Sequence, residues 1–347
     1  MMHSNVATNN SVSPPTGDQS PRLPVSDAVR VIEVGPRDGL QNEKTPIDTT
    51  IKLQLIERLL QVGLREIEAT AFVSPKWVPQ MSDHHALMTR LVALQASQSA
   101  AAQARFSALT PNLQGAQVAI DAGAQELVIF TAASEAFAQK NINCSIEESI
   151  RRFEPIVARL AEHNQAQPPH KAVRLRASIS CAFGCPYAGA IAPSQVVRVV
   201  EQLIPLGITE FDIADTIGVA TPNAVKAVFA AAQQLVPATQ LAGHFHDTYG
   251  QALVNIYAAL ESDIRIFHSS IAGLGGCPYA RGATGNVATE EVVYLLHGLG
   301  MPIVDQTGNR ILEGGIALSE LAATGAWISG IIGRPNQSRA GRALMAH

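Results

Sequence analysis

Apolar and polar positions alternate in blocks along the chain from Ala28 onward. Short runs rich in β-branched and other apolar residues are followed by longer segments whose apolar positions recur with helical spacing. The short runs predict eight strands, at residues 29–34, 66–71, 105–109, 126–131, 173–180, 210–214, 240–246 and 264–271. The segments between them predict helices near 48–62, 82–96, 112–123, 146–166, 193–206, 222–235, 249–262 and 288–299.

The order of these elements predicts a fold class. Each strand is followed by a helix, and the strands are apolar rather than alternating, which is typical of a parallel sheet covered by helices. Eight repeats predict closure into a (β/α)8 TIM barrel. The competing fold is an open doubly wound sheet, but no Gly-x-Gly-x-x-Gly motif follows the first strand.

The same pattern divides the chain into three parts. We expect a barrel domain at 28–300 and a C-terminal helical extension of the same domain at 301–347. The extension packs beside the barrel rim or against a neighbouring subunit. Residues 1–27 are rich in Ser, Asn, Pro and Thr and predict a disordered tail.

Composition narrows the classes of partner. With 347 residues, of which 47% are hydrophobic, the chain can bury a large core. A formal net charge of −4 argues against a nucleic-acid partner, which normally requires a basic surface. No apolar run reaches the ~18 residues that span a bilayer. Four cysteines without a Cys-x-x-Cys pair indicate a reducing compartment. We therefore expect a cytoplasmic protein that binds neither membrane nor nucleic acid.

Polar side chains gather where the predicted strands end. In a barrel the carboxyl ends of all strands meet at one rim, where active sites lie. The side chains in question are Arg37 and Asp38 after the first strand, Glu68 in the second, Asp215 after the sixth, and His244 and His246 in the seventh.

A metal half-site is the first candidate among them. His244 and His246 lie two apart on a strand, so both imidazoles face the same side. Odd-numbered barrel strands share side-chain layers, which lets Asp38 reach them. With the amide oxygen of Asn286 these groups would form an open site that suits Mg²⁺ or Mn²⁺ and could also take Zn²⁺ or Co²⁺. A histidine pair of this kind also occurs by chance, so a purely structural role remains the alternative.

Three further side chains follow the first two strands closely. Arg37 stays charged at any working pH, so it is either a donor to a developing oxyanion or the partner of a salt bridge with Asp38 or Glu68. Glu68 either faces the same cavity or only orients Arg37. Gln41 either binds substrate or holds the first βα loop.

A glycine-rich loop carries one thiol. The segment 271–286 reads Ile-Ala-Gly-Leu-Gly-Gly-Cys-Pro-Tyr-Ala-Arg-Gly-Ala-Thr-Gly-Asn and places Cys277 among five glycines. Glycine permits close approach of backbone to a ligand, which favours a mobile active-site loop. The alternative is a flexible surface loop with an incidental buried thiol.

Several long motifs support a family resemblance. They read Val-Gly-Pro-Arg-Asp-Gly-Leu-Gln-Asn-Glu-Lys at 34–44, Ile-Glu-Ala-Thr-Ala-Phe-Val-Ser-Pro-Lys-Trp-Val-Pro-Gln-Met at 67–81, Lys-Asn-Ile-Asn-Cys-Ser-Ile-Glu-Glu-Ser at 140–149 and His-Phe-His-Asp-Thr-Tyr-Gly at 244–250, followed by the Cys277 loop. Together they resemble the 3-hydroxy-3-methylglutaryl-CoA lyase family, part of a superfamily of metal-dependent TIM-barrel lyases. The resemblance covers roughly residues 30 to 300.

The resemblance implies a role for each matching residue. It makes Asp38, His244, His246 and Asn286 ligands of a divalent cation, Mg²⁺ or Mn²⁺, with no organic cofactor beyond the CoA of the substrate. It makes Arg37 the partner of a substrate oxygen and Cys277 a catalytic thiol, and it places Glu68 and Asp215 on supporting active-site positions, Glu68 among the catalytic residues and Asp215 among the substrate contacts. From the residues themselves we add His244 as a candidate catalytic base, Gln41 as a candidate substrate contact and Lys44 as a candidate partner of the CoA diphosphate. Glu290 falls on a position following the loop. A homodimer is also implied.

The implied reaction cleaves 3-hydroxy-3-methylglutaryl-CoA to acetoacetate and acetyl-CoA. An imidazole, Asp38 or a bound water could serve as the base. Departures at Phe245 and at 174–181 concern the preference for the substrate side chain. The alternatives are a lyase for a longer 3-hydroxy-3-alkylglutaryl-CoA such as the isohexenyl compound, a 2-oxo acid/acetyl-CoA condensing enzyme of the same superfamily, and a catalytically silent barrel that only binds a metabolite or protein.

Overall fold

Eight parallel strands form a closed barrel. The computed structural model describes residues 27–44, 46–276, 285–311 and 315–346. Neighbouring strands pair in order around the barrel, and β10 pairs with β1 to close it. The barrel strands are β1 (Val29–Glu33), β2 (Glu66–Ala71), β3 (Arg105–Leu109), β4 (Glu126–Ala132), β5 (Arg174–Ser180), β8 (Glu210–Asp215), β9 (Leu241–Phe245) and β10 (Ile266–Ser269). The predicted (β/α)8 barrel is confirmed.

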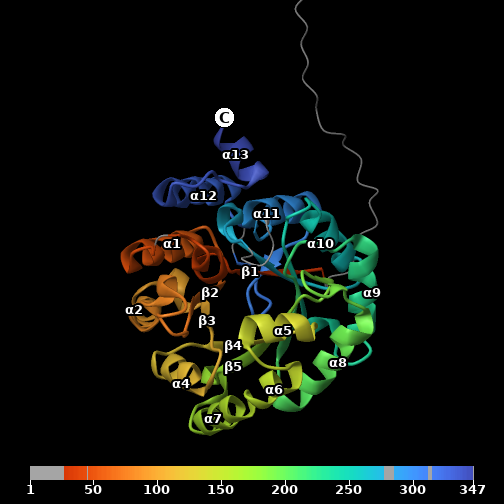
Figure 1. Ribbon diagram of the computed structural model, residues 1–347. Helices are drawn as coiled ribbons and strands as arrows, with labels where there is room; N and C mark the ends of the chain where they lie inside the picture. Colours follow the sequence, from red (N-terminus) through yellow and green to blue (C-terminus); the bar gives the residue numbers. More distant parts are fainter. Residues whose placement is uncertain (1–26, 45, 277–284, 312–314, 347) are drawn as a thin grey trace, which may run out of the picture.

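Helices surround this barrel (Figure 1). Those of the ring are α1 (Thr49–Gln61), α2 (His84–Ser97), α4 (Leu113–Asp121), α6 (Ile146–Arg151), α7 (Glu154–Gln165), α8 (Pro193–Leu203), α9 (Pro222–Ala232), α10 (Ala252–Leu260) and α11 (Thr289–Gly298). Their apolar faces and the outward faces of the strands form one large core. Side-chain caps set several helix starts: Asp48 accepts from the N–H of Thr50 at 2.7 Å, and Asn112 from that of Gly115 at 2.9 Å.

The connections contain shorter elements that hydrophobic periodicity does not predict. They are α3 (Ser99–Ala102), α5 (Glu135–Ile142), the hairpin β6 (Gly184–Cys185) and β7 (Gly189–Ala190), and the short helical turns η1 (Gly35–Gly39), η2 (Pro79–Met81), η3 (Pro169–Lys171), η4 (Ile204–Leu206), η5 (Ala238–Gln240) and η6 (Ile271–Gly273). The single helix predicted at 146–166 is two helices. Pro155 lies in the first turn of α7, where its missing N–H costs no hydrogen bond, whereas inside a longer helix it would break one.

The barrel interior contains many charged side chains beside a small apolar cluster of Ile32, Val34, Ala242 and Ile266. Alternate strand residues point inward, and on β8 these include Glu210 and Asp212. Arg30 contacts Glu66 at 2.5 Å and Glu210 at 2.8 Å near the start of the strands. Because the outward residues are covered by helices, both faces of each strand are buried, and burial alone does not reveal the alternation.

The C-terminal segment packs against the barrel. A short strand, β11 (Ile303–Val304), pairs with the start of β1, and two helices follow, α12 (Leu318–Ile332) and α13 (Arg339–Met345). Helix α12 contacts α1, α11 and the turn η6, and lies outside the helical ring in Figure 1. Its contact with η6, which follows β10, places α12 beside the rim, and the predicted packing against a neighbouring subunit stays a prediction. The short strand was not predicted.

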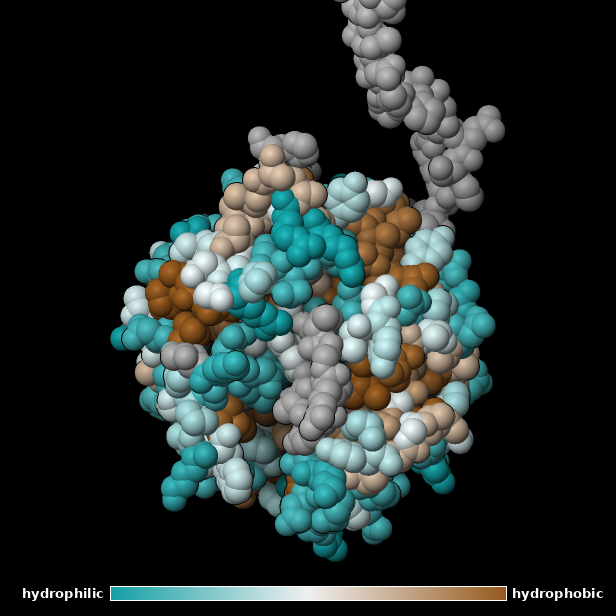
Figure 2. All heavy atoms as spheres, turned by 45° about the horizontal axis from the view of Figure 1, so that its top comes forward, coloured by the Kyte–Doolittle hydropathy of each residue, from teal (hydrophilic) through white to brown (hydrophobic). Residues whose placement is uncertain are grey.

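The surface is mixed in character. Figure 2 shows that hydrophilic residues cover much of one face, with separate hydrophobic patches between them. No helix among the described residues combines the length and the apolar character that crossing a bilayer requires.

Candidate metal centre and cavity

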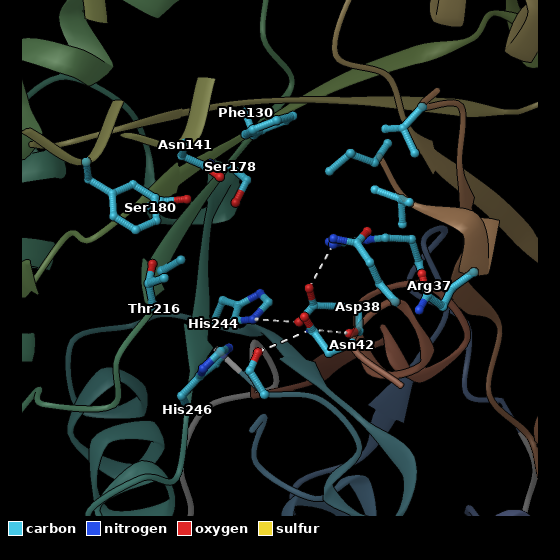
Figure 3. Close-up of a pocket in the computed structure, with 18 of the residues that line it drawn as sticks. Arg37, Asp38, Asn42, Phe130, Asn141, Ser178, Ser180, Thr216, His244 and His246 are labelled. Carbon is cyan, nitrogen blue, oxygen red and sulfur yellow. Dashed lines mark hydrogen bonds and ion pairs between the residues drawn. The ribbon is translucent and has the colours of Figure 1, made fainter. Parts of the chain in front are cut away.

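A cavity of about 510 Å³ lies at the carboxyl ends of the barrel strands. Figure 3 shows His244 and His246 beside Asp38 and Asn42, with Phe130, Asn141, Ser178 and Ser180 on the opposite side. Its lining residues are Arg37, Asp38, Gln41, Asn42, Val73, Trp77, Val78, Gln80, Leu109, Phe130, Phe137, Asn141, Ser178, Ser180, Ala214, Thr216, His244, His246 and Gly276. Of the polar residues predicted at the rim, four line this cavity: Arg37, Asp38, His244 and His246.

The turn after β1 aims Asp38 at this cavity. The π-helical turn η1 forms because the carbonyl of Val34 accepts from three successive N–H groups, those of residues 37 to 39, at 3.2, 2.7 and 3.2 Å. A π-helical turn of this kind is often found at functional sites. Gly39 is needed here, since a Cβ would lie 2.8 Å from the Cβ of Leu274. The turn therefore packs directly against the start of the glycine-rich loop.

Asp38 and the two histidines converge. One ligand atom from each of Asp38, His244 and His246 lies within 4.8 Å of the others. The Nε2 atom of His244 is 3.9 Å from Oδ2 of Asp38, and the two imidazole centroids are 5.5 Å apart. Asp38 and the two histidines, which lie more than two hundred residues apart in the sequence, thus come together. The period of two along the strand and the shared barrel layers predict this.

Asn286 reaches the same point from the glycine-rich loop. Residues 285–287 run antiparallel to the end of β9, which places Asn286 opposite His246. Its Nδ2 donates to Oδ2 of Asp38 at 2.8 Å. Gly275 makes room for this amide: its φ is +128°, and a Cβ there would lie 2.7 Å from Nδ2.

Two buried polar atoms at this point lack a partner among the described residues. They are Nδ1 of His246 and Oδ1 of Asn286. Buried polar atoms are normally hydrogen-bonded, so two such atoms beside a carboxylate call for a ligand. Both are electron-pair donors that suit a divalent cation, and the set of nitrogen and oxygen atoms fits one.

The protonation states of Asp38 and His246 also suit a cation. Burial raises the pKa of Asp38, but Arg37 and the two imidazoles outweigh this and lower it to about 2. Burial and the neighbouring His244 lower the pKa of His246 to about 4. At neutral pH the site therefore offers a carboxylate and a neutral imidazole, the forms that bind metal.

Arg37 lies between this centre and a second carboxylate. Its Nη1 donates to Oδ1 of Asp38 at 2.7 Å, and its Nε donates to Glu68. Nη2 has no acceptor within the described part of the chain. Glu68 does not line the cavity: its other oxygen accepts from Arg176 at 2.5 Å. Of the two predicted roles for Glu68, the geometry favours orienting Arg37.

The predicted substrate contacts divide into two groups. Gln41 lines the cavity beside Arg37. Lys44 is exposed and is not among the lining residues. Asp215 is buried below the rim, and its carboxylate accepts from the N–H groups of Val219 and Ala220 at 3.0 and 2.9 Å. Asp215 is not among the lining residues and orders the loop after β8, and its contact with substrate stays a prediction.

Two buried carboxylates hold the base of the glycine-rich loop. Glu33 accepts from the N–H of Ile271 at 2.9 Å, and Glu290 from that of Ala272 at 3.0 Å. Ala272 has a left-handed φ of +57°, so these bonds hold a strained turn in place. Burial raises the pKa of Glu33 to about 7 and that of Glu290 to about 8. The predicted catalytic thiol, Cys277, lies outside the described residues, as does the predicted tail up to residue 26.

Sequence reasoning missed two residues of this centre. Asn42 donates to the carbonyls of Asp38 at 3.3 Å and Gly276 at 3.2 Å, which ties the first βα loop to the glycine-rich loop. Asp212 lies 3.6 Å from Nδ1 of His244. The period of two along the strand could have indicated Asp212, because it places Glu210, Asp212 and Ala214 on the same inward face. His268 is also buried, and its ring nitrogens lie within hydrogen-bonding distance of Arg176 and His244.

Comparisons with known proteins identify relatives. The family model described as HMGL-like matches residues 28–328. The chain is 48% identical to the mitochondrial hydroxymethylglutaryl-CoA lyase of Arabidopsis thaliana over 316 residues, which cover 91% of this chain and only 62% of that protein. It is 46% identical to the 3-hydroxy-3-isohexenylglutaryl-CoA/hydroxy-methylglutaryl-CoA lyase of Pseudomonas aeruginosa over 318 residues, 92% of this chain and 97% of that one.

A solved structure agrees with these relatives. The crystal structure of hydroxymethylglutaryl-CoA lyase from Pseudomonas aeruginosa superposes on this chain with a TM-score of 0.82 at 46% sequence identity. The match covers 92% of this chain and 98% of that one. The likeness therefore includes the whole barrel and not only the motifs around the cavity.

Proposed function

This chain belongs to the hydroxymethylglutaryl-CoA lyase family, and from that premise we propose that it cleaves 3-hydroxy-3-methylglutaryl-CoA to acetoacetate and acetyl-CoA. One observation carries the proposal: Asp38, His244 and His246 converge within 4.8 Å at the mouth of a cavity. A cation site beside a fixed positive group can stabilise the negative charge that a carbon–carbon lyase generates.

Four side chains would hold the cation. Asp38, His244 and His246 offer their ligand atoms directly, and Asn286 offers its unpartnered oxygen. When bound, a divalent cation would acidify the tertiary hydroxyl of the substrate and fix the geometry of the reacting groups. We propose Mg²⁺ or Mn²⁺, because carboxylate and amide oxygens beside imidazoles suit these ions.

Arg37 would stabilise the charge that the reaction develops. Two of its nitrogens are held by Asp38 and Glu68, so the guanidinium is fixed before substrate binds. Because the Arg37 side chain lines the cavity, its remaining Nη2 can donate to the oxygen of the thioester enolate. A donor that is already in place does not need to reorganise during the reaction.

The bond changes balance without any further reactant. A base takes the proton of the tertiary hydroxyl on C3, counted from the thioester carbon as C1. The bond between C2 and C3 then breaks, and C3 becomes the ketone carbon of acetoacetate. The electron pair of the broken bond forms the enolate of acetyl-CoA. We propose that Cys277 then donates a proton to the enolate carbon, as the resemblance implies.

Removing and restoring the cation tests this proposal. Exhaustive chelation of the purified protein is expected to abolish the release of acetoacetate from 3-hydroxy-3-methylglutaryl-CoA. Adding Mg²⁺ or Mn²⁺ in excess of the chelator is expected to restore it. Full activity in the chelated protein would contradict the proposal, and ligand binding without turnover at any cation concentration would favour the silent-barrel alternative.

A longer 3-alkyl substituent is the second candidate substrate. The Pseudomonas aeruginosa relative is named for both the methyl and the isohexenyl compound. In this chain the cavity carries an apolar wall of Leu109, Phe130 and Phe137, with the small side chain of Ser178 beside it. Filling that space with Ser178→Tyr is expected to reduce kcat/KM for the isohexenyl ester at least tenfold more than for the methyl ester. Equal losses for the two esters would place the alkyl group elsewhere.

A further inference from the structure

A row of buried polar side chains lies below His244 inside the barrel. It contains Asp212 on β8, His268 on β10 and Arg176 on β5. All three are at most 3% exposed. None of them lines the cavity, so they can influence the reaction only through the side chains above them.

The contacts among these three side chains indicate which atoms donate and which accept. Nη1 of Arg176 lies 2.8 Å from Nε2 of His268 and 3.3 Å from Nδ1 of the same ring. Arginine is always a donor, and the shorter of the two contacts favours a lone pair on Nε2 of His268. The imidazole of His268 must then carry its proton on Nδ1. That atom lies 3.3 Å from Oδ2 of Asp212 and 3.2 Å from Nδ1 of His244.

Two proton arrangements are compatible with these contacts. In the first, Nδ1–H of His268 donates to Nδ1 of His244, which forces the proton of His244 onto Nε2. In the second, both Nδ1–H groups face the carboxylate of Asp212, which is 3.6 Å from Nδ1 of His244. Only the second leaves the Nε2 lone pair of His244 free on the side that faces Asp38.

We propose that Asp212 is a positioning residue which fixes the metal-binding tautomer of His244, with His268 and Arg176 holding that carboxylate in its accepting role. A carboxylate can only accept, so it stabilises the arrangement in which both imidazoles donate to it. Metal-bound imidazoles commonly donate their other N–H to such a carboxylate. This inference rests on the proposed function, because it assumes that His244 binds a cation.

The same residues could be taken for a second cation site. Ligand atoms of Asp212, His244 and His268 lie within 4.8 Å of one another. The guanidinium of Arg176 argues against a cation there, since it is fully buried and already donates to His268 at 2.8 Å. A fixed positive charge in a dry interior repels a second one. Asp212, His268 and Arg176 are therefore assigned a role toward the metal centre of Asp38, His244 and His246 and not a cation site of their own.

Cation affinity measures this role directly. Asp212→Asn keeps the size of the side chain, but its amide can donate to Nδ1 of His244 and hold the imidazole in the wrong tautomer. Titration of the metal-free protein with Mn²⁺ in a calorimeter is expected to show affinity reduced roughly 10- to 100-fold. Saturating Mn²⁺ is expected to restore part of kcat, since the ligands themselves remain.

Glu210→Gln provides a matched control. Glu210 is a buried carboxylate on the same inward face of β8, two residues earlier, and it contacts Arg30 instead of a histidine. This variant is expected to lose thermal stability without a change in Mn²⁺ affinity. Asp212→Asn that is folded and binds Mn²⁺ within twofold of the unaltered protein would overturn the proposal. An unaltered protein that binds no divalent cation would instead overturn the proposed function.

A second measurement needs no variant. It tests the proposed tautomer of His244 even if Asp212→Asn does not fold, or if Glu210→Gln loses as much Mn²⁺ affinity as Asp212→Asn. NMR of the ¹⁵N-histidine-labelled, metal-free protein reports which ring nitrogen carries the proton. The proposal expects His244 to carry it on Nδ1. A neutral His244 with its proton on Nε2 would refute the proposal.

Discussion

Asp38→Asn is expected to lower the turnover of 3-hydroxy-3-methylglutaryl-CoA about 10³-fold or more and to weaken Mn²⁺ binding in parallel. The substitution keeps the shape of the side chain but removes the negative charge of the carboxylate that converges with His244 and His246. Loss of cation-derived stabilisation of the transition state amounts to several kcal/mol. Each 1.36 kcal/mol corresponds to a factor of about ten in rate. Steady-state kinetics and calorimetry with Mn²⁺ measure the two effects.

The control for this variant is Asp247→Asn. Asp247 lies next to His246 in the sequence, but its carboxylate accepts from the N–H of Ala252 at 3.0 Å and from Arg339 at 3.2 Å, away from the cavity. This control is expected to keep turnover within a few-fold of the unaltered protein. A folded Asp38→Asn with normal Mn²⁺ affinity would show that the cation lies elsewhere.

Arg37→Gln is expected to separate catalysis from cation binding. Removing one well-placed donor to a developing oxyanion costs about 3 kcal/mol, which corresponds to a fall in kcat of roughly 10²- to 10³-fold. Cation affinity is expected to stay equal or to increase, because the guanidinium beside Asp38 repels a cation. This pattern is the opposite of the one expected for Asp38→Asn, in which turnover and affinity fall together.

Arg37→Lys tests whether geometry or charge matters at this position. An ammonium keeps the charge but cannot bind Asp38 and Glu68 and still present a third donor, as the guanidinium does. We expect kcat to fall nearly as far as in Arg37→Gln. Near-normal kcat in Arg37→Lys would show that only the charge of Arg37 matters. Weakened Mn²⁺ binding with unchanged kcat in Arg37→Gln would contradict the role of Arg37 toward the enolate.

The barrel could be predicted because its signal is repeated eight times. Each apolar strand followed by an amphipathic helix adds to the same conclusion, and the closing pair of β1 and β10 then follows. Local boundaries were less predictable. Helix α5 lies within a connection, where no repeat points to it, and the break between α6 and α7 depends on one proline in an otherwise helical pattern.

The candidate site was predictable where strand geometry determines it. The period of two places His244 and His246 together, and the shared barrel layers bring them to Asp38. Burial of Asp215 was not predictable, because its partners are backbone N–H groups of the following loop, which carry no sequence signal. Asp212 was missed although it shares the inward face of β8 with Glu210, because the strand sequence does not reveal which histidine lies opposite.

Anomalous diffraction from crystals grown with Mn²⁺ tests the central claim most directly. The account predicts one strong peak within about 2.2 Å of a carboxylate oxygen of Asp38 and of one imidazole nitrogen from each of His244 and His246. A peak elsewhere in the cavity, or none at a Mn²⁺ concentration that supports full cleavage in solution, would contradict it.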